Sequence, residues 1–212
     1  MINVRRFFVG PLETNCYVLY KQGQAIVIDP GGDPSDVIFF LEKNGLELLY
    51  ILNTHMHVDH ILGNKPLQEA TGATILANPE DEYLLETSTG KGGGVWGLPR
   101  VEEFSYEPLY PGEQVWLGEV CKVMHTPGHT KGSLSFYFPD SKMVFVGDLI
   151  FQGSVGRTDL PGGDPYVLLK SIKTKIMTLP LDTTIYPGHG PFTTVKDEKY
   201  FNPFLRNETL LF

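Results

Sequence analysis

Short runs rich in apolar residues alternate with amphipathic segments along most of the chain. Apolar runs bounded by glycine, proline or polar residues are typical of buried strands. On this basis we predict strands at residues 25–28, 46–52, 120–124, 134–138, 143–146 and 184–186. Apolar residues at helical spacing predict helices at residues 36–44, 65–71, 79–85 and 166–179, the first with Val37, Ile38, Phe40 and Leu41 on one face.

Turn-forming residues mark where the predicted helices begin and end. Asn44-Gly45 is a stop signal for the first helix, whereas Asn64 is expected to cap the second and Gly72 to terminate it. Residues 87–99 (TSTGKGGGVWGLP) fit neither period, because consecutive glycines hold regular structure poorly. We expect a loop there, either a plain surface connection or a flap that carries Trp96 toward a site.

Composition favours one globular domain over residues 1–212, since no repeat, linker or low-complexity tract divides the chain. A net charge of −8, with scattered lysines and arginines, argues against nucleic-acid binding. No apolar run has the length of a signal peptide or a membrane span, so we expect a cytoplasmic protein without a membrane partner. Cys16 and Cys121 lie in apolar runs and are expected to be buried free thiols. The oligomeric state is open.

Three of the six histidines lie in one short segment, THMHVDH, directly after the predicted strand at 46–52. In extended backbone, residues two apart face the same side, so His55, His57 and Asp59 can converge. His60 is turned differently and could serve a neighbouring position. Imidazoles with a carboxylate suit zinc, iron or manganese.

Three later strands also end in a turn that carries a histidine or an aspartate. These candidates are His129 in HTPGH, Asp148 in VGD and His189 in PGHG. Loops at strand ends are where a rigid scaffold displays chemistry. His125 precedes His129 by four residues and either could be a ligand; we interpret His125 as structural, because the Pro127-Gly128 turn would aim His129 outward.

In this order the motifs resemble those of the metallo-β-lactamase superfamily. THMHVDH is similar to its HxHxDH motif, and HTPGHTKGS, FVGDLIF and YPGHG are similar to its third, fourth and fifth motifs. GDLIFQGSVGRTDLPGGD most resembles the glyoxalase II-like branch, which also contains persulfide dioxygenases. The resemblance implies an α/β fold, the αβ/βα sandwich, with two mixed sheets packed face to face, helices on the outer faces and metals at one edge.

The resemblance also implies a distribution of ligands over one or two metal ions. His55, His57 and His129 would hold the first ion, Asp59, His60 and His189 the second, and Asp148 would bridge them. Zinc is the expected metal, with iron or manganese as alternatives. A metal-bound hydroxide would attack a carbonyl carbon, with Asp59 and Asp148 as catalytic residues. Two divalent ions, two aspartates and a hydroxide sum to about +1, which would attract a small anionic substrate.

The chain departs from true glyoxalase II in three places. It stops soon after YPGHGP, without the helical domain that supplies glutathione contacts, and no tyrosine follows His189 closely. Arg157 stands in place of the lysine after the bridging aspartate. We expect Arg157 to bind an anionic substrate group, with a local ion pair to Asp159 as the alternative, and we interpret Lys131 as a surface cation.

We therefore predict a metal-dependent hydrolase of thioesters of the hydroxyacyl-glutathione type. The first alternative is a mononuclear iron persulfide dioxygenase on the same scaffold. An alternative of another class is a non-catalytic metal-binding domain, against which the intact ligand set argues. Net charge disfavours a nuclease, and the hydrolysis of β-lactams or lactones stays open.

Overall fold

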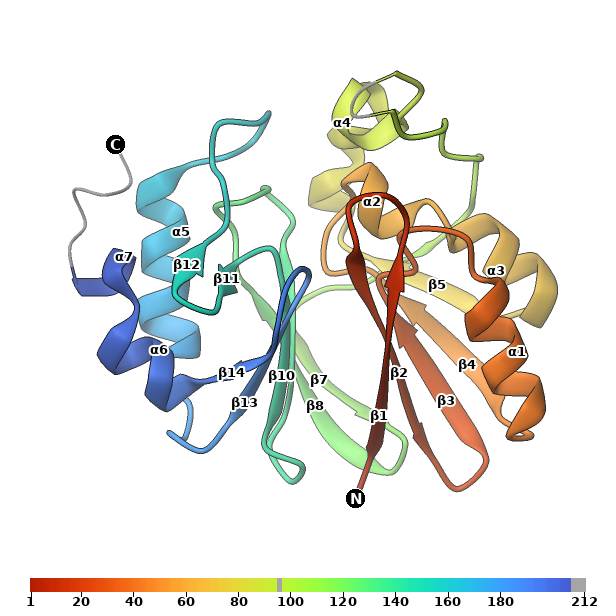
Figure 1. The fold of residues 1–212 in the computed structure, drawn as a ribbon, viewed down its shortest axis with the longest axis horizontal. Helices are drawn as coiled ribbons and strands as arrows, with labels where there is room; N and C mark the ends of the chain where they lie inside the picture. Colours follow the sequence, from red (N-terminus) through yellow and green to blue (C-terminus); the bar gives the residue numbers. More distant parts are fainter. Residues whose placement is uncertain (95–96, 207–212) are drawn as a thin grey trace. The chain divides into compact units, whose positions relative to one another are not determined.

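A computed structural model describes residues 1–94 and 97–206 of the chain. The chain forms two compact units, Met1–Leu109 and Tyr110–Phe212. Each unit contains a six-stranded mixed sheet with helices beside it (Figure 1). The expectation that residues 1–212 form a single domain stays a prediction.

The first unit is built on a sheet whose strands follow the chain order, β1 to β6. Strands β1 to β3 are antiparallel neighbours, and β3 to β6 are parallel neighbours. Parallel strands are joined through segments that contain helices. The strands are β1 (Asn3–Val9), β2 (Thr14–Lys21), β3 (Gln24–Ile28), β4 (Glu47–Leu52), β5 (Thr74–Ala77) and β6 (Glu107–Pro108).

Helices α1 and α3 cover one face of this sheet (Figure 1). Val37 and Leu41 of α1 and Leu67 of α3 are buried against strand residues such as Val27 and Ile51. This packing explains why the apolar spacing of the first predicted helix was visible in the sequence. The helices of the unit are α1 (Ser35–Lys43), α2 (Val58–Ile61), α3 (Asn64–Thr71), the 3-10 helix η1 (Pro79–Glu86) and α4 (Ser88–Lys91).

The second unit has a sheet with the strand order β14-β13-β10-β9-β8-β7, in which only β10 and β13 are parallel. Its core joins Val144, Val146 and Ile185 of the sheet to Leu168 and Ile172 of the helical segment. The elements are β7 (Gly112–Trp116), β8 (Glu119–His125), β9 (Leu134–Phe138), β10 (Met143–Gly147), the small pair β11 (Ile150–Phe151) and β12 (Ser154–Val155), α5 (Pro165–Ser171), the π-helix η2 (Ile172–Ile176), β13 (Thr184–Pro187), β14 (Thr193–Thr194), α6 (Val195–Phe201) and α7 (Pro203–Arg206).

All the predicted strands are confirmed to within one residue at each end, as β3, β4, β8, β9, β10 and β13. The helices predicted first and second are confirmed as α1 and α3, and the third is confirmed as a 3-10 helix. The prediction of the fourth helix, at residues 166–179, is right only in part. Asp164 accepts hydrogen bonds from the first turn of α5, but the helix widens into a π-helix and ends at Ile176.

Two details predicted at the helix ends have different outcomes. Gly72 ends α3 in the left-handed conformation, as predicted. The prediction that Asn64 caps α3 is wrong, because Gly63 occupies the N-cap position and has no side chain to accept a hydrogen bond. The Asn64 amide instead donates to Asn53 at 2.8 Å and accepts from it at 3.2 Å in a buried pair. That pair ties the start of α3 to the residue that follows β4.

The segment predicted as a loop at 87–99 contains one helical turn, α4. Beyond it, Gly92 has φ +68° and forms an isolated antiparallel bridge with Arg100. Trp96 lies outside the described residues, so its role as part of a flap stays a prediction. No helix among the described residues combines the length and apolar character that crossing a bilayer requires. The cytoplasmic location also stays a prediction.

Candidate metal centre

The first group of candidate ligands lies between β4 and α3. The backbone is extended at His57 (φ −71°, ψ 147°), and α2 begins at the next residue, Val58. The extended geometry expected through Asp59 is therefore wrong beyond His57. A hydrogen bond from His60 N to the His57 carbonyl, at 2.9 Å, closes the first turn of α2, so Asp59 and His60 are held by a helix.

The four candidate side chains of this group nevertheless come together, and all are buried. The ring of His55 lies 4.8 Å from that of His57 and 4.1 Å from that of His60, measured between centroids. His60 Nε2 lies 3.6 Å from Asp59 Oδ2. Asp59 Oδ2 also accepts a hydrogen bond from the hydroxyl of Thr14 on β2, at 3.3 Å.

Asp29, which directly follows β3, orients two of these histidines. Its Oδ2 accepts from the Thr54 hydroxyl at 2.6 Å and from His60 Nδ1 at 2.9 Å, and its Oδ1 accepts from Thr54 N at 2.7 Å. Because the Thr54 hydroxyl donates to Asp29, it accepts from His55 Nδ1, 3.0 Å away. Both rings therefore carry their proton on Nδ1, which leaves the lone pair on Nε2 to bind a metal.

Asp29, His55 and His60 also each place one possible ligand atom within 4.8 Å of the others. Asp29 is already hydrogen-bonded to the ring nitrogen of His60 that faces away from Nε2. We therefore interpret Asp29 as the partner that lies behind the ligands. Sequence reasoning did not identify this aspartate. The available signal was the same as for Asp148, an aspartate at the end of a buried strand.

A close backbone approach holds this arrangement in place. A Cβ atom on Gly31 would lie 1.5 Å from the carbonyl oxygen of Asp59. Any other residue at that position would push α2 away from the segment that follows β3. The glycine after Asp29-Pro30 is thus required by the position of Asp59.

The second group of candidate ligands lies at strand ends of the second unit. His129 Nε2 lies 3.8 Å and His189 Nε2 3.6 Å from Asp148 Oδ2. His129 is buried, and its Nδ1 lies 2.8 Å from the backbone carbonyl of Arg157, which fixes the proton on Nδ1. A Cβ on Gly156 would lie 1.8 Å from the carbonyl oxygen of Asp148. The three side chains therefore converge within their own unit.

Arg157 and Asp159 form the local ion pair that the sequence left open. Nε and Nη2 of Arg157 each donate to one carboxylate oxygen of Asp159, both at 2.8 Å. The hydrogen bonds from Arg157 hold the pKa of the Asp159 carboxyl down to about 2. The Arg157 side chain is 52% exposed. Its role in binding substrate stays a prediction.

The side chain of His125 contacts the backbone of Lys131. His125 ends β8, and its Nε2 lies 2.7 Å from the carbonyl oxygen of Lys131. This contact bridges the turn that presents His129. The structural role of His125 and the surface role of Lys131 stay predictions.

Both cysteines are free and buried, as predicted. Burial raises the pKa of the Cys16 and Cys121 thiols well above the usual range. A thiolate ligand from either residue is therefore disfavoured.

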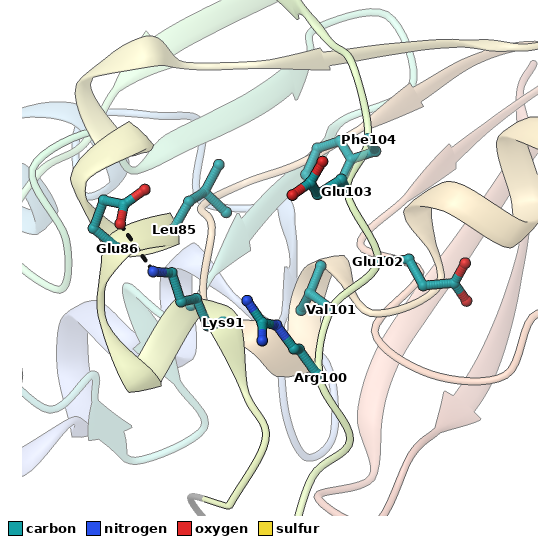
Figure 2. Close-up of a pocket in the computed structure, with 9 residues that line it drawn as sticks. Leu85, Glu86, Lys91, Arg100, Val101, Glu102, Glu103 and Phe104 are labelled. Atoms are coloured by element: carbon teal, nitrogen blue, oxygen red, sulfur yellow. Dashed lines mark hydrogen bonds and ion pairs between the residues drawn. The ribbon is translucent and has the colours of Figure 1, made fainter.

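A pocket of about 380 Å³ lies in the first unit, at the ends of η1 and α4. Figure 2 shows Lys91 bonded to Glu86, with Arg100 beside it and Glu102 turned away. Leu85, Val101 and Phe104 form its apolar part. None of the predicted ligands lines this pocket, whose rim carries both signs of charge.

The family model and the most similar curated sequences indicate the same family. The family model described as the metallo-beta-lactamase superfamily matches residues 9–189. A probable metallo-hydrolase of Bacillus subtilis (strain 168) is 36% identical, over 97% of this chain and 99% of its own length. A hydroxyacylglutathione hydrolase of Haemophilus influenzae is 34% identical, over 98% of this chain and 100% of its own length.

Solved structures agree with the sequence relatives. The B3 metallo-beta-lactamase BLEG-1 is 36% identical and superposes with a TM-score of 0.90, over 97% of this chain and all of its own. A di-iron-bound form of TTHA1623 is 39% identical with a TM-score of 0.87, over 95% of this chain and all of its own. These matches confirm the predicted α/β fold class with two mixed sheets. The chain belongs to the metallo-β-lactamase superfamily.

Proposed function

We propose that this chain is a hydrolase that uses metal ions to cleave thioesters of the hydroxyacyl-glutathione type. The observation that carries the proposal is the hydrogen-bond chain from Asp29 to the rings of His55 and His60. A neutral imidazole with its proton fixed on Nδ1 is prepared to bind a metal through Nε2. The full-length similarity to a hydroxyacylglutathione hydrolase supports the choice of substrate.

The proposed ligands are the seven residues expected from the motifs. Each of the two groups converges within its own unit, and the family match spans the residues of both. The ligand set comprises His55, His57, Asp59, His60, His129, Asp148 and His189. Nitrogen and carboxylate donors without thiolate fit zinc, iron and manganese. Zinc is our first choice, at one or two ions per chain. Iron is the alternative that the di-iron form of TTHA1623 supports.

When bound, such ions polarise a carbonyl group and make water nucleophilic at neutral pH. The protein's part is to hold the donors in one orientation. Asp29 and Thr54 fix the Nδ1 protons of His55 and His60, so that Nε2 is the atom available to a metal, and the Arg157 carbonyl does the same for His129. Thr14 orients the Asp59 carboxylate. Asp59 and Asp148 supply the negative charge that retains the cations, as the proposed catalytic carboxylates.

Metal analysis beside a substrate panel tests the proposal. We expect one to two ions per chain and loss of thioesterase activity on chelation. His57→Ala should remove metal without unfolding the chain, whereas His125→Ala, the matched control, should keep it. A well-folded, metal-free preparation with full activity would overturn the proposal. β-Lactams and lactones belong in the panel, and iron content with oxygen uptake would support a dioxygenase instead.

A further inference from the structure

The segment that presents His55 and His57 follows β4, and at its first residue Asn53 N still donates to the carbonyl of Leu76 on β5. β4 ends at Leu52 and α2 begins at Val58, so residues 53–57 lie between regular elements. Two carboxylates bind its amide groups. Asp29 accepts from Thr54 N at 2.7 Å, and Asp81 accepts from Met56 N at 3.2 Å.

Asp81 reaches this segment from the opposite side of β4. In the sheet, β3 and β5 are the two neighbours of β4. Asp29 follows β3 directly, and Asp81 lies on η1, which follows β5. Beyond Asn53, the two carboxylates thus accept hydrogen bonds from the backbone of this segment, and each belongs to the chain that follows one of the strands beside β4.

The Asp81 contact is fully buried. Asp81 and Met56 are both 0% exposed, and Met56 packs with Ile61, Ala77 and Leu84 in a small apolar cluster. A carboxylate is expensive to bury unless hydrogen bonds compensate it. A charged acceptor also makes a stronger bond to an amide than a neutral acceptor does. The contact therefore fixes the peptide at Met56 more firmly than apolar packing alone would.

Met56 lies between two proposed metal ligands, so any rotation of its peptide moves both imidazoles. Metal sites require ligand distances within about 0.2 Å of their preferred values. We infer that Asp81 is a positioning residue of the metal centre, because it anchors the amide that sets the relative placement of His55 and His57. This inference rests on the proposed metal binding.

The test measures zinc affinity by competition with a chelator, together with the visible spectrum of the cobalt-substituted protein. Asp81→Leu keeps the number of side-chain heavy atoms but removes the hydrogen-bond acceptor. We expect the Kd for zinc to rise 10- to 100-fold, which is the usual effect of removing a residue that supports a metal ligand. Asp81→Asn keeps an acceptor oxygen without the charge. It should fold even if Asp81→Leu does not, and should show a smaller loss with a shifted cobalt spectrum. Glu82→Gln, an exposed neighbour on η1, is the matched control and should match wild type.

Thermal unfolding of the metal-free proteins separates positioning from simple stabilisation. A purely structural Asp81 would lower Tm and leave the zinc Kd and cobalt spectrum of the folded variants at wild-type values. That result, in Asp81→Asn or in a folded Asp81→Leu, would overturn the inference. If wild type itself bound no metal, the proposed function would fail instead, so the two failures are distinguishable.

Discussion

Replacing Asp29 with Asn should reverse the direction of the hydrogen-bond chain behind the metal ligands. Oδ1 must still accept from Thr54 N, so the introduced amide nitrogen takes the place of Oδ2. That nitrogen donates, whereas Oδ2 accepts from both the Thr54 hydroxyl and His60 Nδ1. His60 Nδ1 would then have to accept, and the Thr54 hydroxyl would donate to His55. Both rings would carry their proton on Nε2, the atom expected to bind metal.

The size of the effect follows from the bonds that metal binding would break. To regain Nε2 lone pairs, the variant must give up both bonds at the former Oδ2 position. Each buried amide hydrogen left without an acceptor costs roughly 1.5 kcal/mol, so the loss is about 3 kcal/mol. At 1.4 kcal/mol per factor of ten, the Kd for zinc should rise about 100-fold. Backbone strain adds little, because Asp29 has φ +53° and Asn tolerates that region well.

Two measurements check this prediction on the same samples. Chelator competition gives the zinc Kd, and long-range ¹H–¹⁵N NMR of the metal-free protein shows which ring nitrogen of each histidine carries the proton. Asp36→Asn, at an exposed position on α1, controls for the loss of one charge. An unchanged Kd, or rings that still carry Nδ1 protons in the Asp29 variant, would refute the reasoning.

Four further outcomes are expected. Arg157→Ala should raise KM for anionic thioesters by roughly tenfold, with less effect on neutral ones and none on metal content; Arg100→Ala is the control, and equal losses on both substrates would make the Arg157–Asp159 pair a scaffold contact. By NMR titration the Asp159 carboxyl should show a pKa of about 2; because this pKa is lowered on folding, the pair's stabilisation is present above about pH 4 and is lost as pH falls toward 2. Cys16 and Cys121 should resist thiol reagents until the chain unfolds, since burial raises their pKa, and gel-shift assays at physiological salt should show no RNA or DNA binding.

Three of the strands that the sequence predicted are buried on both faces, although β2, buried at six of its eight positions, was not predicted. Residues 25–28 of β3 and all of β9 and β10 are buried, and continuous apolar runs record that environment. The edge strands β1 and β7 were not predicted. β1 is exposed or half-buried at most positions and carries Arg5 and Arg6, and four of the five residues of β7 are exposed. An edge strand has too little apolar surface to leave a continuous run.

The candidate ligands could be predicted because each motif is local. His55, His57, Asp59 and His60 lie within a few residues of one another, and the other candidates lie within a few residues of the end of an apolar strand. The residues behind them could not be predicted in the same way. The contacts of Asp29 with Thr54 and of Asp81 with Met56 each span 25 residues. Such pairs form only when parallel strands bring their ends to the same edge, and no local spacing encodes which aspartate arrives there.

The two buried carboxylates also explain why metal loading need not fold this segment. In proteins whose ligands are disordered without metal, binding free energy is folding free energy. Here Asp29 holds Thr54 and His60, Asp81 holds Met56, and Gly31 admits the backbone of Asp59, all through contacts among protein atoms. The free-energy cost of ordering the proposed ligands would thus be offset by contacts within the protein. A bound ion would meet oriented donors with negative charge behind them, which favours a cation even where the donors themselves are neutral imidazoles.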